Sequence, residues 1–171
     1  MNRDELRALQ APLKQRYRDD ATAGIVTLSA EGRLGEEVSC NVETARALVA
    51  AGLHPATGGT GALACSGDML LQALVACAGV TLSAVATSLG IPLRGGKLRA
   101  EGDLDFRGAL GVSKEAPVGF TRIRLEVDLE TDAGEEERRK LLELTERYCV
   151  VFQTITRGVE VSVRPGDSRD R

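Results

Sequence analysis

Apolar and polar residues alternate along several short stretches of this chain, most clearly at residues 120–130. There Ile123, Leu125, Val127 and Leu129 are separated by mostly charged residues. A period of two predicts a strand with one buried and one wet face, and such a sheet is normally antiparallel. Weaker patterns predict further strands at 24–29, 38–42, 97–107 and 159–163, with a turn at 31–33 that makes the first two a hairpin.

Residues 66–89 form the longest apolar run, and its apolar side chains occur on every side of a helix. Asp68 is the only formal charge in the run, which predicts a helix that is buried all round. The length approaches that of a membrane span, but polar side chains such as Gln72 and Thr81 interrupt it and its flanks lack anchoring aromatics. We therefore expect a central core helix.

Two more helices and a loop complete the predicted elements. Residues 3–18 predict a helix that Pro12 interrupts, and residues 134–149 predict a helix capped by Thr131 or Asp132. Residues 52–67 hold five glycines and a proline, which indicates an ordered loop or linker without regular structure. Strands grouped around two helices favour an α+β fold over a doubly wound sheet.

Composition narrows the class of protein. The 171 residues suit one domain, and a net charge of −3 with 3% aromatic residues predicts neither the basic patch nor the stacking surface of a nucleic-acid-binding protein. The first twenty residues are rich in charge and hold no apolar core of a secretory signal, so we expect a cytoplasmic protein. His54 is the single histidine, and we expect it on the loop surface or beside the site.

Four cysteines are then the main reactive side chains: Cys40, Cys65, Cys77 and Cys149. Thiols in the cytoplasm are mostly reduced, so an even number of cysteines does not imply structural disulfides there. The spacings match no zinc-finger, haem-attachment or Cys-x-x-Cys motif. We therefore expect isolated thiols and no metal site.

Each of these thiols is either part of the core or functional. As a nucleophile, Cys77 needs a cation from a distant segment or another chain, because residues 47–93 contain no Lys or Arg. Cys65 lies near the start of the predicted helix, where the helix dipole favours a thiolate. It is therefore the alternative candidate to Cys77 for the reactive thiol. Cys149, predicted at a helix C-terminus, should be the less acidic thiol, which suits a resolving role. We expect Cys40 to be a packing residue.

Two separated motifs resemble those of the OsmC/Ohr family, most closely its OsmC-like branch. They are GGTGALACSGDMLLQALVACAGVTL at residues 58–82 and ERYC at residues 146–149, within a resemblance that spans about residues 25–163. It implies an intertwined α+β homodimer, in which two cysteine-bearing helices pack between antiparallel sheets and the active sites lie at the subunit interface. The expected organisation is a helical segment at 1–20, a single OsmC-like domain at 21–165 and a disordered tail at 166–171.

The resemblance also implies a thiol-dependent peroxidase. The Cys77 thiolate would reduce an organic or lipid hydroperoxide and become a sulfenic acid, which Cys149 would resolve as a disulfide. Arg33 matches the family's thiolate-supporting arginine by order and spacing, and apolar neighbours such as Leu74 would favour apolar peroxides. A small dithiol or a dithiol protein would be the reductant, without a cofactor, a metal, nucleic acid or a membrane.

Two positions depart from the pattern of the hydroperoxide-reducing branch. The glutamate found ten residues before the helix cysteine is Gly67 here, and we keep Asp68, one place later, as a candidate site residue. Asp68 cannot orient Cys77 within one helix, because nine residues advance a helix by about 13 Å. The proline that often follows the second cysteine is Val150. These departures favour the alternative hypothesis, an OsmC-like dimer without turnover that binds a small molecule or senses redox state.

Overall fold

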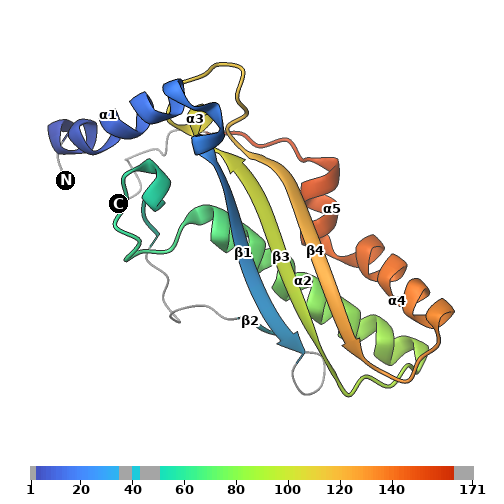
Figure 1. The fold of residues 1–171 in the computed structure, drawn as a ribbon. Helices are drawn as coiled ribbons and strands as arrows, with labels where there is room; N and C mark the ends of the chain where they lie inside the picture. Colours follow the sequence, from blue (N-terminus) through green and yellow to red (C-terminus); the bar gives the residue numbers. More distant parts are fainter. Residues whose placement is uncertain (1–2, 35–39, 43–50, 164–171) are drawn as a thin grey trace, which may run out of the picture.

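A computed structural model describes residues 3–34, 40–42 and 51–163. Four strands form an antiparallel sheet in the order β2-β1-β3-β4, and α2 runs along one face of it (Figure 1). The strands are β1 (Ile25–Leu34), β2 (Cys40–Val42), β3 (Gly95–Asp105) and β4 (Phe120–Glu130). The helices are α1 (Arg3–Asp19), η1 (Ala21–Gly24), η2 (Pro55–Thr57), α2 (Ser66–Leu89), α3 (Phe106–Ala109), α4 (Glu135–Tyr148) and α5 (Val150–Arg157). The predicted α+β class is confirmed.

The alternation at residues 120–130 gives β4 its predicted bounds. Within the sheet, Val127 lies opposite Leu98 of β3, and Leu125 lies opposite Ala100. Directly opposed residues share one face of a sheet, so the apolar sets of the two strands coincide. Leu98 and Ala100 are fully buried, and β3 packs on α2. The core therefore forms between this face and the long helix.

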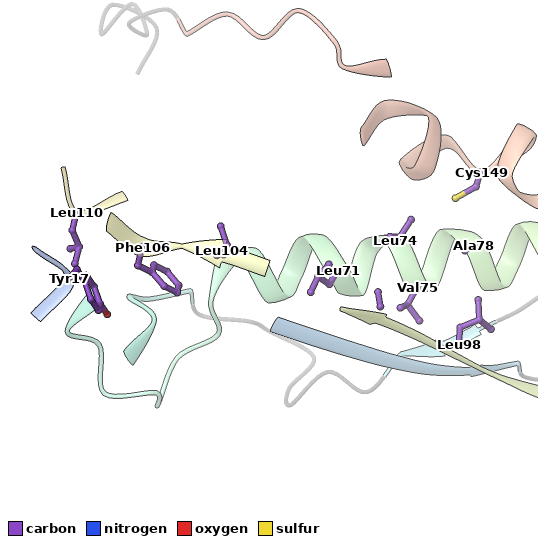
Figure 2. Packing of buried hydrophobic residues seen from close by; sticks show 11 residues of the cluster. Tyr17, Leu71, Leu74, Val75, Ala78, Leu98, Leu104, Phe106, Leu110 and Cys149 are labelled. Carbon is purple, nitrogen blue, oxygen red and sulfur yellow. The ribbon is translucent and has the colours of Figure 1, made fainter. Parts of the chain in front are cut away.

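Helix α2 also has its predicted bounds and forms the centre of the core. Figure 2 shows Leu71, Leu74, Val75 and Ala78 on consecutive turns of α2, with Leu98 of β3 beside them. The helix ends at Gly90, whose left-handed backbone (φ +70°) lets its amide donate to the carbonyls of the last turn. By length and composition alone α2 would also qualify as a membrane span, a test that core helices of soluble proteins pass as well.

The prediction that α2 is buried all round is wrong for the single chain. The sheet and the helices α4 and α5 cover only part of its circumference. The remaining stripe, which we call the exposed α2 face, consists of Met69, Leu70, Ala73, Val80 and Ala84. Three of its side chains, Met69, Leu70 and Val80, are 36%, 39% and 40% exposed. The single chain therefore leaves one apolar side of α2 exposed to solvent.

The strand predictions need two corrections. The predicted turn at 31–33 lies inside β1, because Gly32 pairs with Leu98 on one side and Val42 on the other, which keeps the backbone extended. Residues 159–163 form no strand in the described part of the chain, and Val163 is 96% exposed. An alternating pattern of apolar and polar residues forms a strand only where the backbone of a neighbouring strand is available for hydrogen bonding. Of the predicted partner of β1, residues 40–42 are confirmed as β2, and residues 38 and 39 lie outside the described residues.

Several predicted boundaries also shift. Helix α1 continues through Pro12, and Tyr17 near its end is buried and donates a hydrogen bond to the Ala56 carbonyl at 2.5 Å. Strand β3 ends at Asp105, two residues before its predicted end at residue 107, and α3 begins at Phe106. The loop at 52–67 contains the short 3-10 helix η2, although its many glycines predicted no regular structure there. The predicted tail at 166–171 lies outside the described residues.

The N-cap of α4 also differs from the prediction. Gly134 takes this position, and its amide donates to the Glu137 carboxylate at 3.0 Å. The predicted cap residue Thr131 instead donates from its hydroxyl to the Pro92 carbonyl at 2.7 Å, which ties the start of α4 to the end of α2. Asp132 forms an ion pair with Arg94. Both side chains therefore bind the loop between α2 and β3 rather than the first turn of α4.

The buried face of α2 should dominate the stability of the chain. Replacing the fully buried side chain in Leu71→Ala should lower the free energy of unfolding by about 2 to 5 kcal/mol, because it leaves a cavity in the core. Urea denaturation followed by circular dichroism measures this loss. Leu89→Ala, at the 37% exposed end of the same helix, is the matched control and should cost less than about 1 kcal/mol. Equal losses for both variants would contradict this location of the core.

Candidate active site

Helix α5, which the sequence analysis missed, begins immediately after α4. Cys149 is both the C-cap of α4 and the N-cap of α5. Its sulfur accepts a hydrogen bond from the Phe152 amide at 3.4 Å, and its carbonyl accepts one from the Gln153 amide at 2.9 Å. A sulfur at this position satisfies one of the free amides of the first turn. The chain therefore bends at Cys149 and starts a second helix there.

The bend brings Cys149 against α2. Figure 2 shows its sulfur pointing from the α4–α5 junction toward α2, above the turn between Leu74 and Ala78. Cys77 belongs to this turn, and each of the two thiols shifts the pKa of the other. Cys149 is 1% exposed, whereas Cys77 is half-buried beside the exposed α2 face. The two sulfurs are free and adjacent, although 71 other residues separate them in the chain.

The surroundings of Cys77 favour its thiolate. Burial raises the pKa of the Cys77 thiol, but hydrogen bonds from the Val151 amide, the Cys149 thiol, the Thr81 hydroxyl and the Val150 amide outweigh burial. The net result is a pKa below the usual range of a thiol. Two of these donors are the free amides at the N-terminus of α5, where the helix dipole also favours a negative charge.

Cys149 is the opposite kind of thiol. Burial first, and then the hydrogen bond to Cys77 and the negative charge on it, together raise the pKa of Cys149 to about 11, against a lowering contribution from the Phe152 amide. Cys149 therefore stays protonated at neutral pH and donates its S–H to the Cys77 thiolate. The expectation that Cys149 is the less acidic thiol agrees with this environment, but the reason differs. Burial beside a second thiol, rather than a helix C-terminus alone, sets its pKa.

A small apolar cavity is lined by neighbours of the two thiols rather than by the thiols themselves. It has a volume of about 80 Å³ and lies between α2, β4 and α5. Leu74 lines it one turn before Cys77, and Phe152, whose amide binds the Cys149 sulfur, lines it from α5. The remaining lining residues are Ile123, Leu125, Ile155 and Thr156. Cys77 therefore has apolar surroundings on the α5 side as well as on the exposed α2 face.

The other two predicted site residues, Asp68 and Arg33, are not among the groups that act on the thiol pair in the described part of the structure. Asp68 lies in the first turn of α2, where burial raises its carboxyl pKa and the charge of His54 opposes that shift. Arg33 lies in β1 opposite Asn41 and Lys97, and its side chain is outside what the structure describes. Among the described side chains, no Lys or Arg contributes to the pKa shift of Cys77.

His54 organises the glycine-rich loop rather than the thiol pair. Its Nδ1 accepts a hydrogen bond from the Ala56 amide at 3.0 Å, which caps η2, and its ring stacks on Phe106 at a centroid distance of 4.9 Å. Gly59 follows, where an added Cβ would lie 1.7 Å from the Leu53 carbonyl oxygen. Only glycine fits this close approach. Of the two predicted alternatives, an ordered loop and a linker, the structure shows the ordered loop.

The remaining cysteines occupy separate positions. Cys65 is the N-cap of α2, without a side-chain capping bond, and packs at the margin of the core. Cys40 lies in β2, and its side chain is outside the described part of the structure. Among the described side chains, no group of three or more His, Cys, Asp or Glu residues could hold a metal ion.

The site is therefore a pair of unlike thiols held by a helix N-terminus in an α+β fold. A family model described as "OsmC-like protein" matches residues 59–164, which include both cysteines of the pair. This match covers more than half of the chain, and the chain belongs to the OsmC-like family. The resemblance seen in the sequence is confirmed.

Comparison with solved structures supports the same fold. The chain is similar to the crystal structure of an OsmC-like hydroperoxide resistance protein from Jannaschia sp. CCS1, with a TM-score of 0.61. The two share 15% sequence identity, and the alignment covers 85% of this chain and 96% of the other. At this identity the similarity concerns the fold alone. No match is found among curated protein sequences.

The amides of α5 should measurably activate Cys77. Val150→Pro removes one N–H at the first helical position, where proline is tolerated, and the extended backbone of Cys149 suits a following proline. We expect the alkylation of Cys77 by iodoacetamide at pH 7 to slow by about two- to fivefold, because the thiolate loses a donor. Cleavage before Asp68 separates Cys77 from Cys65, so mass spectrometry can follow each thiol.

The matched control is Val150→Ala, which keeps the N–H and truncates a side chain that is already 70% exposed. Its rate of Cys77 alkylation should equal that of the wild type. Identical rates for the proline and alanine variants would show that this amide does not stabilise the thiolate.

Proposed function

We propose that this protein is a thiol-dependent peroxidase that reduces organic or lipid hydroperoxides, with Cys77 as the peroxidatic thiol. The observation that carries this proposal is the pairing of Cys77, whose pKa is lowered, with an adjacent, protonated Cys149. A thiolate is the nucleophile in peroxide reduction, and a neighbouring thiol converts the oxidised product into a reducible disulfide. Membership of the OsmC-like family and similarity to a hydroperoxide resistance protein support a peroxide-related function.

In the first step, the Cys77 thiolate attacks the oxygen of the hydroperoxide that lies farther from the organic group. An S–O bond forms, the O–O bond breaks, and the leaving alkoxide takes up a proton to become an alcohol. Cys77 is oxidised to a sulfenic acid, and the hydroperoxide is reduced. Leu74 and the cavity beside it favour binding of the apolar organic group of such a substrate. Met69 and Val80 on the exposed α2 face favour it as well.

In the second step, the Cys149 sulfur attacks the sulfenic sulfur of Cys77. The S–S bond forms, and the hydroxyl group leaves as water with the proton from Cys149. A small dithiol or a dithiol protein then reduces this disulfide through a mixed disulfide and is itself oxidised. A cytoplasmic location, which we propose from the sequence, would keep such a reductant available. Arg33 is our proposed additional cation for the thiolate, and Asp68 a second site residue near the start of α2.

The proposed active form is a homodimer. The exposed α2 face is apolar, adjoins half-buried Cys77 and has no cover within the described chain. A second copy of the chain fits this surface because the same stripe on both subunits would be self-complementary across a twofold axis. Such an assembly would shield Cys77 and could supply the cation that the described side chains do not provide.

Peroxidase activity tests the central assignment. With cumene hydroperoxide and a dithiol donor, Cys77→Ser should lose about a hundredfold or more of the turnover rate, because oxygen is a far weaker nucleophile than a thiolate. Cys149→Ser should stop multiple turnover with the dithiol while still allowing Cys77 to form a sulfenic acid. A dimedone-type probe detects that intermediate by mass spectrometry.

Cys65→Ser is the matched control for this experiment, because Cys65 lies at the start of the same helix and away from Cys149. It should retain wild-type turnover. Undiminished turnover in Cys77→Ser would end the assignment. A wild-type protein that forms the Cys77–Cys149 disulfide under peroxide without turnover would instead favour a redox sensor, and one that does neither would favour a small-molecule-binding dimer.

The oligomeric state tests the role of the exposed α2 face. We expect light scattering after size exclusion to give the mass of two chains for the wild type and of one chain for Val80→Lys. The lysine would place a charge in an apolar interface. Val118→Lys is the control, because Val118 is 68% exposed in the loop before β4 and should leave the dimer intact. A monomeric wild type would refute the proposed assembly.

A further inference from the structure

Thr81 lies one helical turn after Cys77 on α2, so the two side chains occupy the same side of the helix. This side faces the α4–α5 junction, since Leu74, a turn before Cys77, lines the cavity with Phe152 and Ile155 of α5. Thr81 is half-buried, which limits competition from water for its hydroxyl group. Its position therefore adds a polar group to the cluster formed by the two thiols and the first amides of α5.

A helical threonine commonly donates its hydroxyl to the carbonyl four residues earlier. Thr87, Thr145 and Thr156 do so in this structure, at 2.8, 2.8 and 2.9 Å. For Thr81 the residue four positions earlier is Cys77 itself, so the two half-buried side chains are neighbours on one side of α2. The Thr81 hydroxyl also lowers the pKa of the Cys77 thiol. A hydroxyl that donates to a thiolate makes a charge-assisted hydrogen bond, which is stronger than a bond to a neutral acceptor.

We propose that Thr81 is a positioning residue of the candidate active site, whose hydroxyl holds the Cys77 sulfur toward the α5 amides and stabilises it as the thiolate. Val150 and Val151 then donate from α5 and Thr81 donates from α2, so the sulfur is held from two elements. This proposal deepens the proposed function and rests on it for its biological consequence. The same hydrogen bond should also exist in a protein that lacks peroxidase turnover.

The test is the pH dependence of Cys77 alkylation by iodoacetamide in the full-length protein. Thr81→Val keeps the shape of the side chain and removes the donor. We expect its midpoint to move to higher pH and its rate at pH 7 to fall by about three- to tenfold. The rate on the high-pH plateau should be equal to or slightly above that of the wild type, because a thiolate of higher pKa is more nucleophilic.

Two matched variants separate the hydroxyl from other effects. Thr81→Ser restores the donor without the methyl group and should return the wild-type profile to within about twofold. Thr87→Val removes the equivalent hydroxyl two turns along the same helix, where it binds the Ser83 carbonyl, and should leave the Cys77 profile unchanged. Among the described side chains, the titratable group that acts on Cys77 is Cys149, whose pKa of about 11 keeps it protonated over most of the titration.

Three outcomes would overturn the proposal. They are a Thr81→Val profile that superimposes on that of the wild type, a Thr81→Ser profile that matches the valine variant, and an equal loss of rate at every pH. The last result would indicate altered access rather than a lost hydrogen bond. Alkylation requires no peroxide, so these outcomes are independent of the peroxidase assay, and the absence of turnover would leave the test of Thr81 intact.

Discussion

The contact between Cys77 and the N-terminus of α5 is the constraint on which the candidate site depends. A half-buried thiol in an apolar helix would ordinarily stay protonated, because burial disfavours its charged form. The backbone amides of Val150 and Val151, together with two side-chain donors, reverse that preference. Backbone amides at a helix start are fixed by the helix itself, so this stabilisation needs no charged side chain from the same region of the chain.

The two thiols differ because the fold buries them differently. Cys149 is nearly inaccessible at the junction of two helices, and its pKa of about 11 keeps it a hydrogen-bond donor. Cys77 is half-buried at the margin of the exposed α2 face. One thiol of the pair is thus partly exposed and has a lowered pKa, and the other is enclosed and has a raised pKa. This division of properties matches the separate demands of attacking a peroxide and resolving a sulfenic acid.

Helix α2 links the core to the site and to the proposed subunit interface. One side of it carries Leu71, Val75 and Ala78, which are buried in the core. The next side presents Cys77 and Thr81 to α5, and the remaining stripe is apolar and exposed. A single helix can meet these three demands because its residues repeat every 3.6 positions, so consecutive residues point to different neighbours. Asp68 and His54 form a separate cluster at the other end of the helix, beside the glycine-rich loop.

The bounds of α2 and β4 and the α+β class were predictable from the residues alone, because a long apolar run and a strict alternation are local signals. The family was predictable from the two motifs at residues 58–82 and 146–149. The sequence also singled out Cys77 and Cys149. The helix at residues 150–157 was not predictable in this way, because its valines and isoleucine favour a strand locally. Packing on Leu74 and capping by Cys149 select the helix instead. The two backbone donors to Cys77, the amides of Val150 and Val151, were hidden for the same reason, because backbone amides leave no mark in a sequence. Residues 159–163 show the converse, since their alternating pattern is present without a neighbouring strand to pair with in the described chain.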